Sequence, residues 1–206
     1  TISVLARKSR KASEQEATDY VAAMLLAVSM MFLRFMILIL IFSREIFLSI
    51  YPYLLTMAVV AAIVAWFIHS RQKRSNDQPV EEEEDDSSNP LEFKVALIFA
   101  VLFVIFTFLT HYTLVYAGTG GLNLLSFVSG FSDITPFILN LLQNTGSVAA
   151  LIITACSMQA IISNIMVNMF YALFFAGKGS KLRPWILGGF GVVIACNLVL
   201  LLFFYI

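Results

Sequence analysis

Residues 120–136 read GGLNLLSFVSGFSDITP, a glycine- and serine-rich segment in an otherwise apolar part of the chain. It combines glycines and hydroxyl side chains with one carboxylate, Asp133, and long apolar segments flank it on both sides. A lipid bilayer holds no water to solvate an interrupted backbone or a charge, so such a segment persists only where protein or an aqueous cavity surrounds it. Because a carboxylate at membrane depth is costly, Asp133 is a candidate for a functional site.

The composition is that of a membrane protein. Hydrophobic residues make up 60% of the chain and charged residues 13%, and the mean hydropathy is +0.88. Soluble domains have roughly 45–50% apolar and about 25% charged residues. A soluble fold of 206 residues could not bury 19 phenylalanines together with apolar runs such as 35–42. We therefore expect an all-α integral membrane protein in a lipid bilayer. The net charge of zero and the lack of a basic patch argue against a nucleic-acid partner.

Five segments are long enough to cross a hydrocarbon core, which needs about 20 residues. The expected membrane helices are 20–42, 50–68, 93–117, 148–175 and 185–206. Pro52 and Pro184 fall near the first turn of their expected helices, where a missing N–H costs little. The segment 121–143 is a weaker sixth candidate, because glycine and serine interrupt it.

The distribution of lysine and arginine predicts the orientation, since cytoplasmic loops carry the excess of both. Basic residues precede the first expected helix and follow the second, so we expect the N-terminus and the loop 70–89 in the cytoplasm and the turn 43–49 outside. The loop before the last helix is basic as well: Lys178, Lys181 and Arg183. Both assignments hold only if 121–143 enters and leaves on the same face. The sequence therefore predicts a broken or re-entrant segment there.

The chain divides into three parts. Residues 1–69 form a first helical hairpin, which we interpret as the tail of a truncated N-terminal half. Residues 70–89 form a charged cytoplasmic linker, whose acidic run 81–86 reads as a solvated segment and not as a cation sensor. Residues 90–206 form a second helical unit. The segment 135–143 weakly echoes 1–9, so we expect an internal repeat, and paired interrupted segments in two halves mark the binding sites of transporters.

Asp133 supports two interpretations. As a cation ligand or proton carrier it would act with neighbouring oxygens, because hard cations take oxygen ligands. As a helix N-cap it would begin a helix near 134–136, with Pro136 in the first turn. A helix N-terminus at this position would instead favour an anion. The hydroxyl neighbours of Asp133 in this prediction are Ser126, Ser129, Ser132 and Thr135.

Three further polar residues lie inside expected membrane helices. Arg34 is near the middle of the first helix, so it needs a partner or a cavity, and Asp133 is the acid at comparable depth. Arg34 thus forms an ion pair with Asp133, binds solute, or reaches an interface. Asn164 and Asn168 share one helical face with Ser157, either for interhelical hydrogen bonds or as the lining of a pathway.

No catalytic or cofactor motif is recognisable, and we expect neither enzymatic activity nor a cofactor. Cys156 and Cys196 lie in apolar segments without a second cysteine or histidine at ligand spacing. They read as small buried hydrophobic residues. The identity of any bound metal does not follow from these residues.

Four motifs resemble the C-terminal membrane domain of unknown function in MgtC/SapB-type bacterial proteins. They are LARKS at 5–9, MFLR at 31–34, NPLEFK at 89–94, and the glycine- and serine-rich stretch 121–133. The resemblance implies a multi-pass protein of the bacterial inner membrane, a missing N-terminal MgtC-like half as partner, and an association with magnesium homeostasis. The stretch 131–136 departs from the family pattern, so a two-carboxylate site does not carry over.

We therefore expect a domain that transports an ion or a small solute, with a site at mid-depth around Asp133. The alternative is a non-transporting regulatory or scaffolding membrane module related to magnesium homeostasis. In either case the chain could assemble as a homo-oligomer.

Overall fold

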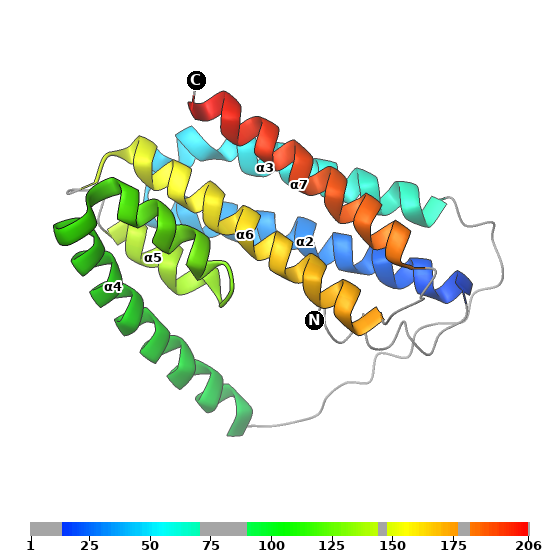
Figure 1. Cartoon of the computed structure of the whole chain (residues 1–206), viewed down its shortest axis with the longest axis horizontal. Coiled ribbons are helices and arrows are strands. Elements are labelled where there is room, and N and C mark those ends of the chain that lie inside the picture. Colours follow the sequence, from blue (N-terminus) through cyan, green and yellow to red (C-terminus); the bar gives the residue numbers. More distant parts are fainter. Residues whose placement is uncertain (1–13, 71–89, 144–147, 177–181, 206) are drawn as a thin grey trace.

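The computed structural model describes residues 14–70, 90–143, 148–176 and 182–205, and within these ranges all regular structure is helical (Figure 1). The elements are α2 (Glu14–Phe42), α3 (Arg44–Ser70), α4 (Pro90–Ser129), α5 (Ile134–Gln143), α6 (Ala150–Ala176) and α7 (Arg183–Tyr205). Five of these helices are long and apolar enough to cross a membrane. The predicted fold class, an all-α membrane protein with about five spans, is confirmed.

The first two helices are joined by a single residue, Ser43. Its hydroxyl accepts a hydrogen bond from the backbone N–H of Ile46 at 3.4 Å, and its carbonyl accepts from Phe47 at 2.9 Å. Because this cap starts α3 at Arg44, the predicted turn over 43–49 is wrong. Pro52 consequently lies inside α3 and not in its first turn.

The glycine-rich stretch breaks the chain twice. At Gly118, α4 departs from helical geometry with φ 58° and ψ −148°, a conformation open essentially to glycine alone. We call 90–117 the N-terminal arm of α4 and 119–129 the inner arm. The inner arm runs back into the bundle, the chain turns at 130–133, and α5 returns to the end where the inner arm began (Figure 1).

The inner arm, the turn and α5 together form a re-entrant hairpin, and we call 130–135 its tip. Ten helical residues span about 15 Å, which is half of a hydrocarbon core about 30 Å thick. The predicted broken segment is therefore confirmed, and a leg of this length is too short to cross such a core by itself.

Helix α6 is the central element against which the hairpin packs. Of the 18 most apolar consecutive residues in each helix, 67% are buried in α6 and 11% are buried in α4. Hydrogen-bonded pairs follow the same order on the inner arm and on α6: Asn123–Cys156, Ser126–Gln159 and Gly130–Asn164. The inner arm thus runs parallel to the first half of α6, and the tip lies beside the middle of that helix.

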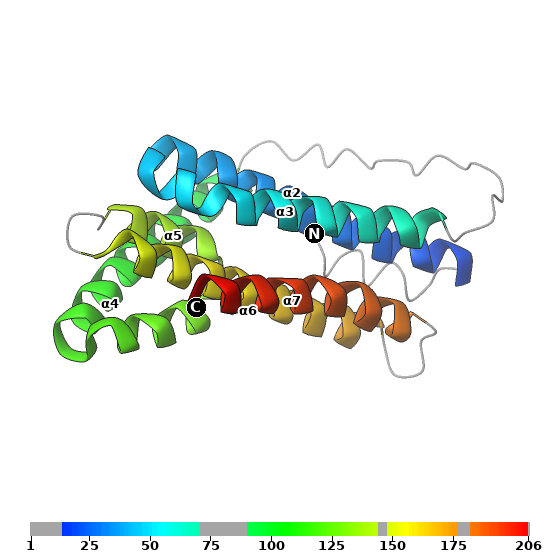
Figure 2. The ribbon, with the colours of Figure 1, turned by 90° about the horizontal axis from the view of Figure 1, so that it is seen from above.

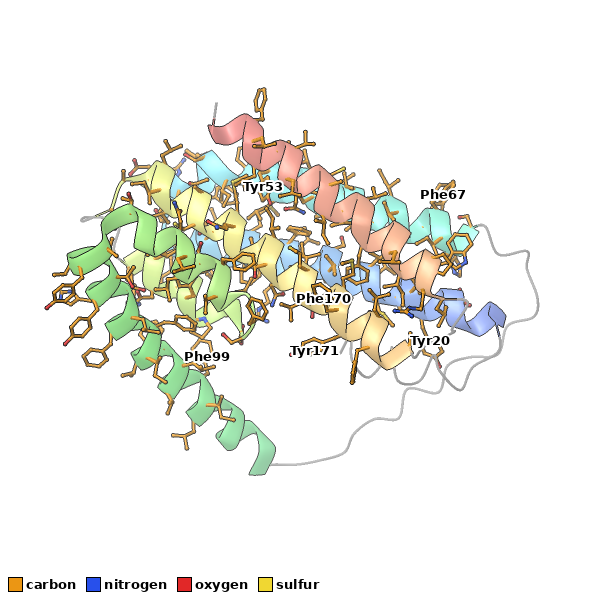
Figure 3. The ribbon with its side chains drawn as sticks, in the orientation of Figure 1. Tyr20, Tyr53, Phe67, Phe99, Phe170 and Tyr171 are labelled. Carbon is orange, nitrogen blue, oxygen red and sulfur yellow. The ribbon has the colours of Figure 1, made fainter. Side chains whose placement is uncertain are left out.

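The remaining helices surround this centre. Figure 2 shows the α2–α3 pair as one layer and α6 with α7 as another. The N-terminal arm of α4 diverges from the bundle toward its first residue (Figure 1). Tyr53 of α3 lies between α3 and α7 (Figure 3), where its hydroxyl donates to the side-chain oxygen of Asn197. Gly189 of α7 admits Leu25, since a Cβ there would meet Leu25 Cδ1 at 2.7 Å.

The ends of the helices group as the distribution of basic residues predicts. The start of α2, the end of α3, the end of α6 and the start of α7 lie at one end of the bundle (Figure 1). The α2–α3 junction, the kink in α4 and the end of α5 lie at the other end. Most of the basic residues that carry the orientation prediction, in 1–13, 71–89 and 177–181, lie outside the described residues.

Candidate functional site

Asp133 is the N-cap of α5. One of its carboxylate oxygens, Oδ1, accepts a hydrogen bond from the backbone N–H of Thr135 at 2.9 Å and a second from the Thr135 hydroxyl at 2.7 Å. A cap side chain satisfies a backbone donor that the first turn of a helix leaves open. The capping interpretation therefore holds, and it places the carboxylate at the tip of the hairpin.

Arg34 of α2 reaches the same tip. Its Nη2 donates to the hydroxyl oxygen of Thr135 at 3.2 Å. In the described part of the chain, one ion pair is found, between His69 and Asp19 at 2.9 Å, and it does not involve the tip. The predicted Arg34–Asp133 ion pair is thus wrong as a direct contact. The reason is that the Thr135 hydroxyl lies between the two groups, accepting from one and donating to the other.

Helix α6 satisfies the backbone where the hairpin turns. The side-chain amide of Asn164 donates to the carbonyl of Gly130 at 3.1 Å and to that of Ser132 at 3.4 Å. Asn168 in turn donates to Asn164 Oδ1 at 3.0 Å. A Cβ at Gly130 would lie 2.4 Å from Ser163 Cβ, so glycine lets the tip approach α6 this closely. Asn164 and Asn168 therefore hold the tip in place.

Three of the predicted hydroxyl neighbours do not donate their hydrogen bonds to Asp133. Ser126, Ser129 and Ser132 each donate to a carbonyl three residues earlier, at 2.7, 2.7 and 3.1 Å. In a helix, as for Ser126 and Ser129, a serine hydroxyl can bond to the preceding turn in this way, and Ser132 does the same from the turn after α4. Of the four predicted hydroxyl neighbours, Thr135 is therefore the one that hydrogen-bonds the carboxylate, and a role of the other three in binding solute stays a prediction.

Burial divides the hairpin into a closed part and an open part. Ser126, Ser129 and Thr135 are at most 4% exposed, whereas Arg34, Ser132 and Asp133 are exposed. In a helix bundle of this apolarity, exposed charges that lie within a bilayer require water or a polar partner. The tip is thus the part of the hairpin that can meet a solute.

A family profile described as "Domain of unknown function (DUF4010)" matches residues 1–176. The chain belongs to the DUF4010 family. The DUF4010 chain is also similar to an uncharacterized protein of Aquifex aeolicus (strain VF5), with 24% identity over 154 residues that cover 74% of this chain and 67% of the relative. No solved structure matches it.

Sequence reasoning missed several polar contacts of this DUF4010 chain. The thiol of Cys156 donates to Asn123 Oδ1 at 3.3 Å, and the amide of Asn140 in α5 donates to the Thr107 hydroxyl at 2.8 Å. Asn123 and Asn140 stand in the interrupted segment, and polarity inside an apolar run was the signal that could have found them. Ser157, on the predicted face of Asn164, is fully buried and its hydroxyl has no partner within the described ranges.

The described residues do not assemble a recognisable metal centre. Within the ranges covered by the structure, no three His, Cys, Asp or Glu side chains lie close enough together to hold a metal ion. The chemistry available at the tip is therefore a guanidinium, a carboxylate, a hydroxyl and two amides.

Proposed function

We propose that this DUF4010 domain transports a small solute or ion across a membrane and that the hairpin tip is its binding site. The observation that carries this proposal is the hairpin, which ends on a capped carboxylate and meets an arginine of another helix. Legs about 15 Å long would bring that tip near the middle of a bilayer. Transporters place their sites near the bilayer midplane, where helices are interrupted.

The packing of the hairpin supports a site with access from one side. The two legs bury apolar side chains between the tip and the end of the bundle where the hairpin enters: Leu122, Phe137, Ile138 and Leu141 are each 0% exposed. The tip itself exposes Asp133 and Ser132. In our proposal, solute reaches the tip from the opposite end of the bundle, and movement of the hairpin would open the other path.

Thiol accessibility tests the hydrated path. In a background with Cys156→Ser and Cys196→Ala, Ser132→Cys should react with a charged maleimide in membranes. The matched control is Val59→Cys near the middle of α3, which is 48% exposed but should face hydrocarbon and stay unreactive. Uniform protection of positions 126–135 would contradict a hydrated site and favour a scaffold.

Flux tests the transport function itself. In proteoliposomes loaded with a panel of ions and small solutes, Asp133→Asn and Arg34→Ala should each reduce the flux of the transported species. Unchanged flux in both variants would exclude the tip as the site.

A specific observation favours the alternative, a non-transporting regulatory or scaffolding module. The N-terminal arm of α4 exposes large apolar side chains along its length, including Leu97, Val101 and Phe108, and such a surface could bind other helices or a second copy of the chain. Protection of the tip from maleimide together with absent flux would support this function.

The setting belongs to the same proposal. We place the domain in a bacterial inner membrane, with the N-terminus and 70–89 in the cytoplasm and with an MgtC-like half as partner. The basic residues of the loops, the four MgtC/SapB-like motifs and the similarity to an Aquifex aeolicus protein support it. A link to magnesium homeostasis would follow from that partner and not from the tip, which offers a single carboxylate.

A further inference from the structure

The charged groups at the tip have hydrogen-bonding capacity left over. A guanidinium carries five N–H donors, and Arg34 uses Nη2 on Thr135. Asp133 accepts both of its bonds at Oδ1, and within the described ranges Oδ2 has no partner. Both side chains are exposed. One free face of the tip is therefore a positive donor and the other a negative acceptor.

Arg34 and Asp133 carry opposite charges and hydrogen-bond the same hydroxyl group. Arg34 Nη2 and Asp133 Oδ1 are 3.2 Å and 2.7 Å from the same Thr135 oxygen. A free cation that binds Asp133 would be repelled by the nearby guanidinium, and a free anion that binds Arg34 would be repelled by the carboxylate. Uncompensated charge at membrane depth is costly. A solute that carries both charges leaves neither side unbalanced.

Building on the transport function proposed above, we propose that the tip binds a small zwitterion with an ammonium and a carboxylate on one carbon, as in an α-amino acid. The solute carboxylate binds the free N–H groups of Arg34, for which paired N–H···O bonds are the favoured geometry. The solute ammonium donates to Asp133 Oδ2. Thr135 keeps the two protein groups apart, so that the solute bridges them and they do not neutralise each other.

Binding to the purified full chain in lipid nanodiscs tests this proposal without any variant. The probes are radiolabelled L-amino acids, with propionate and ethylammonium as competitors that carry one of the two charges each. We expect at least one amino acid to bind and neither competitor to displace it at equal concentration. Displacement by propionate alone or by ethylammonium alone would overturn the zwitterion.

Variants then locate the site. Arg34→Gln and Asp133→Asn should each weaken binding of that amino acid by about tenfold or more. Arg44→Gln and Glu45→Gln, which remove exposed charges at the bundle end, should leave binding unchanged. Equal affinity in the tip variants would place the amino acid elsewhere and refute the proposal.

The flux panel separates this inference from the function on which it rests. Flux of a simple cation or anion that depends on the tip, without amino-acid binding, would refute the zwitterion and leave the transport function standing. Absence of flux and of binding for every solute would overturn both.

Discussion

Thr135 links the two charged side chains of the hairpin tip. A hydroxyl has one donor and two lone pairs, so this residue accepts from Arg34 and donates to Asp133 through one oxygen atom. Its backbone N–H gives the carboxylate a second bond. Arg34 and Asp133 therefore remain separate. Each has a neutral hydrogen-bond partner in Thr135 and keeps its own charge.

Removing the Thr135 hydroxyl should destabilise the tip. Thr135→Val keeps the shape of the side chain but loses the bonds to both charged groups, and a hydrogen bond to a charged group contributes about 1.5–3 kcal/mol. We expect the free energy of unfolding to fall by about 2 kcal/mol, measured by detergent titration. Thr135→Ser retains the hydroxyl and is the control. A valine variant as stable as the wild type would contradict the linking role.

At the scale of the element, the hairpin depends on close backbone contact with α6. Gly130 lies against Ser163 and against the backbone nitrogen of Asn164, which brings its carbonyl within reach of the Asn164 amide. This contact places the turn and gives its carbonyls donors where the hydrocarbon offers no water. The hairpin is thus anchored at its tip as well as along its legs.

An alanine at Gly130 should loosen that anchor. Its Cβ would lie 2.4 Å from Ser163 Cβ and 2.8 Å from the Asn164 nitrogen, so α6 or the turn must shift, at a cost of about 1–3 kcal/mol. Gly120→Ala is the matched control, because nothing lies within 4 Å of a Cβ at that position. We expect thermal unfolding to show a loss for the first variant and none for the second. Equal stability of the two would show that the contact does not anchor the tip.

The outlines of the elements followed from sequence more readily than their contacts. Hydropathy and the basic loops predicted the re-entrant segment. Both depend on the bilayer and not on individual neighbours, because one reports the length of apolar stretches and the other the side on which a loop lies. The start of α3 was missed because a single serine suffices to cap it. Helical periodicity places residues on faces without naming the neighbour. It could not show that Ser126, Ser129 and Ser132 bond to carbonyls three residues earlier or that Thr135 separates Arg34 from Asp133.

In the whole molecule, the arrangement of the helix ends predicts which end of the bundle faces the cytoplasm. The end of α3, the end of α6 and the start of α7 lie together, and the end of α5 lies opposite (Figure 1). Since lysine and arginine are retained in the cytoplasm, the basic loops next to the first group should face inward.

Reporter fusions check this arrangement. A reporter after residue 70 and one after residue 176 should both be active in the cytoplasm, and one after residue 143 should be active outside. A fusion after residue 129, within the re-entrant hairpin, is not informative about sides and serves to report insertion alone. Opposite locations for the reporters at 70 and 176 would contradict the fold.

The one-residue junction at Ser43 has a mechanical consequence. With no loop between them, α2 and α3 have little freedom to rotate against each other, and we expect them to move as one rigid body. Arg34 belongs to this α2–α3 unit, while Asp133 and Thr135 belong to the hairpin. The 3.2 Å hydrogen bond from Arg34 to Thr135 therefore connects the α2–α3 unit to the hairpin. Movement of the α2–α3 pair against the hairpin would therefore change the distance between Arg34 and Thr135, and a solute bound between Arg34 and Asp133 would in turn resist that movement.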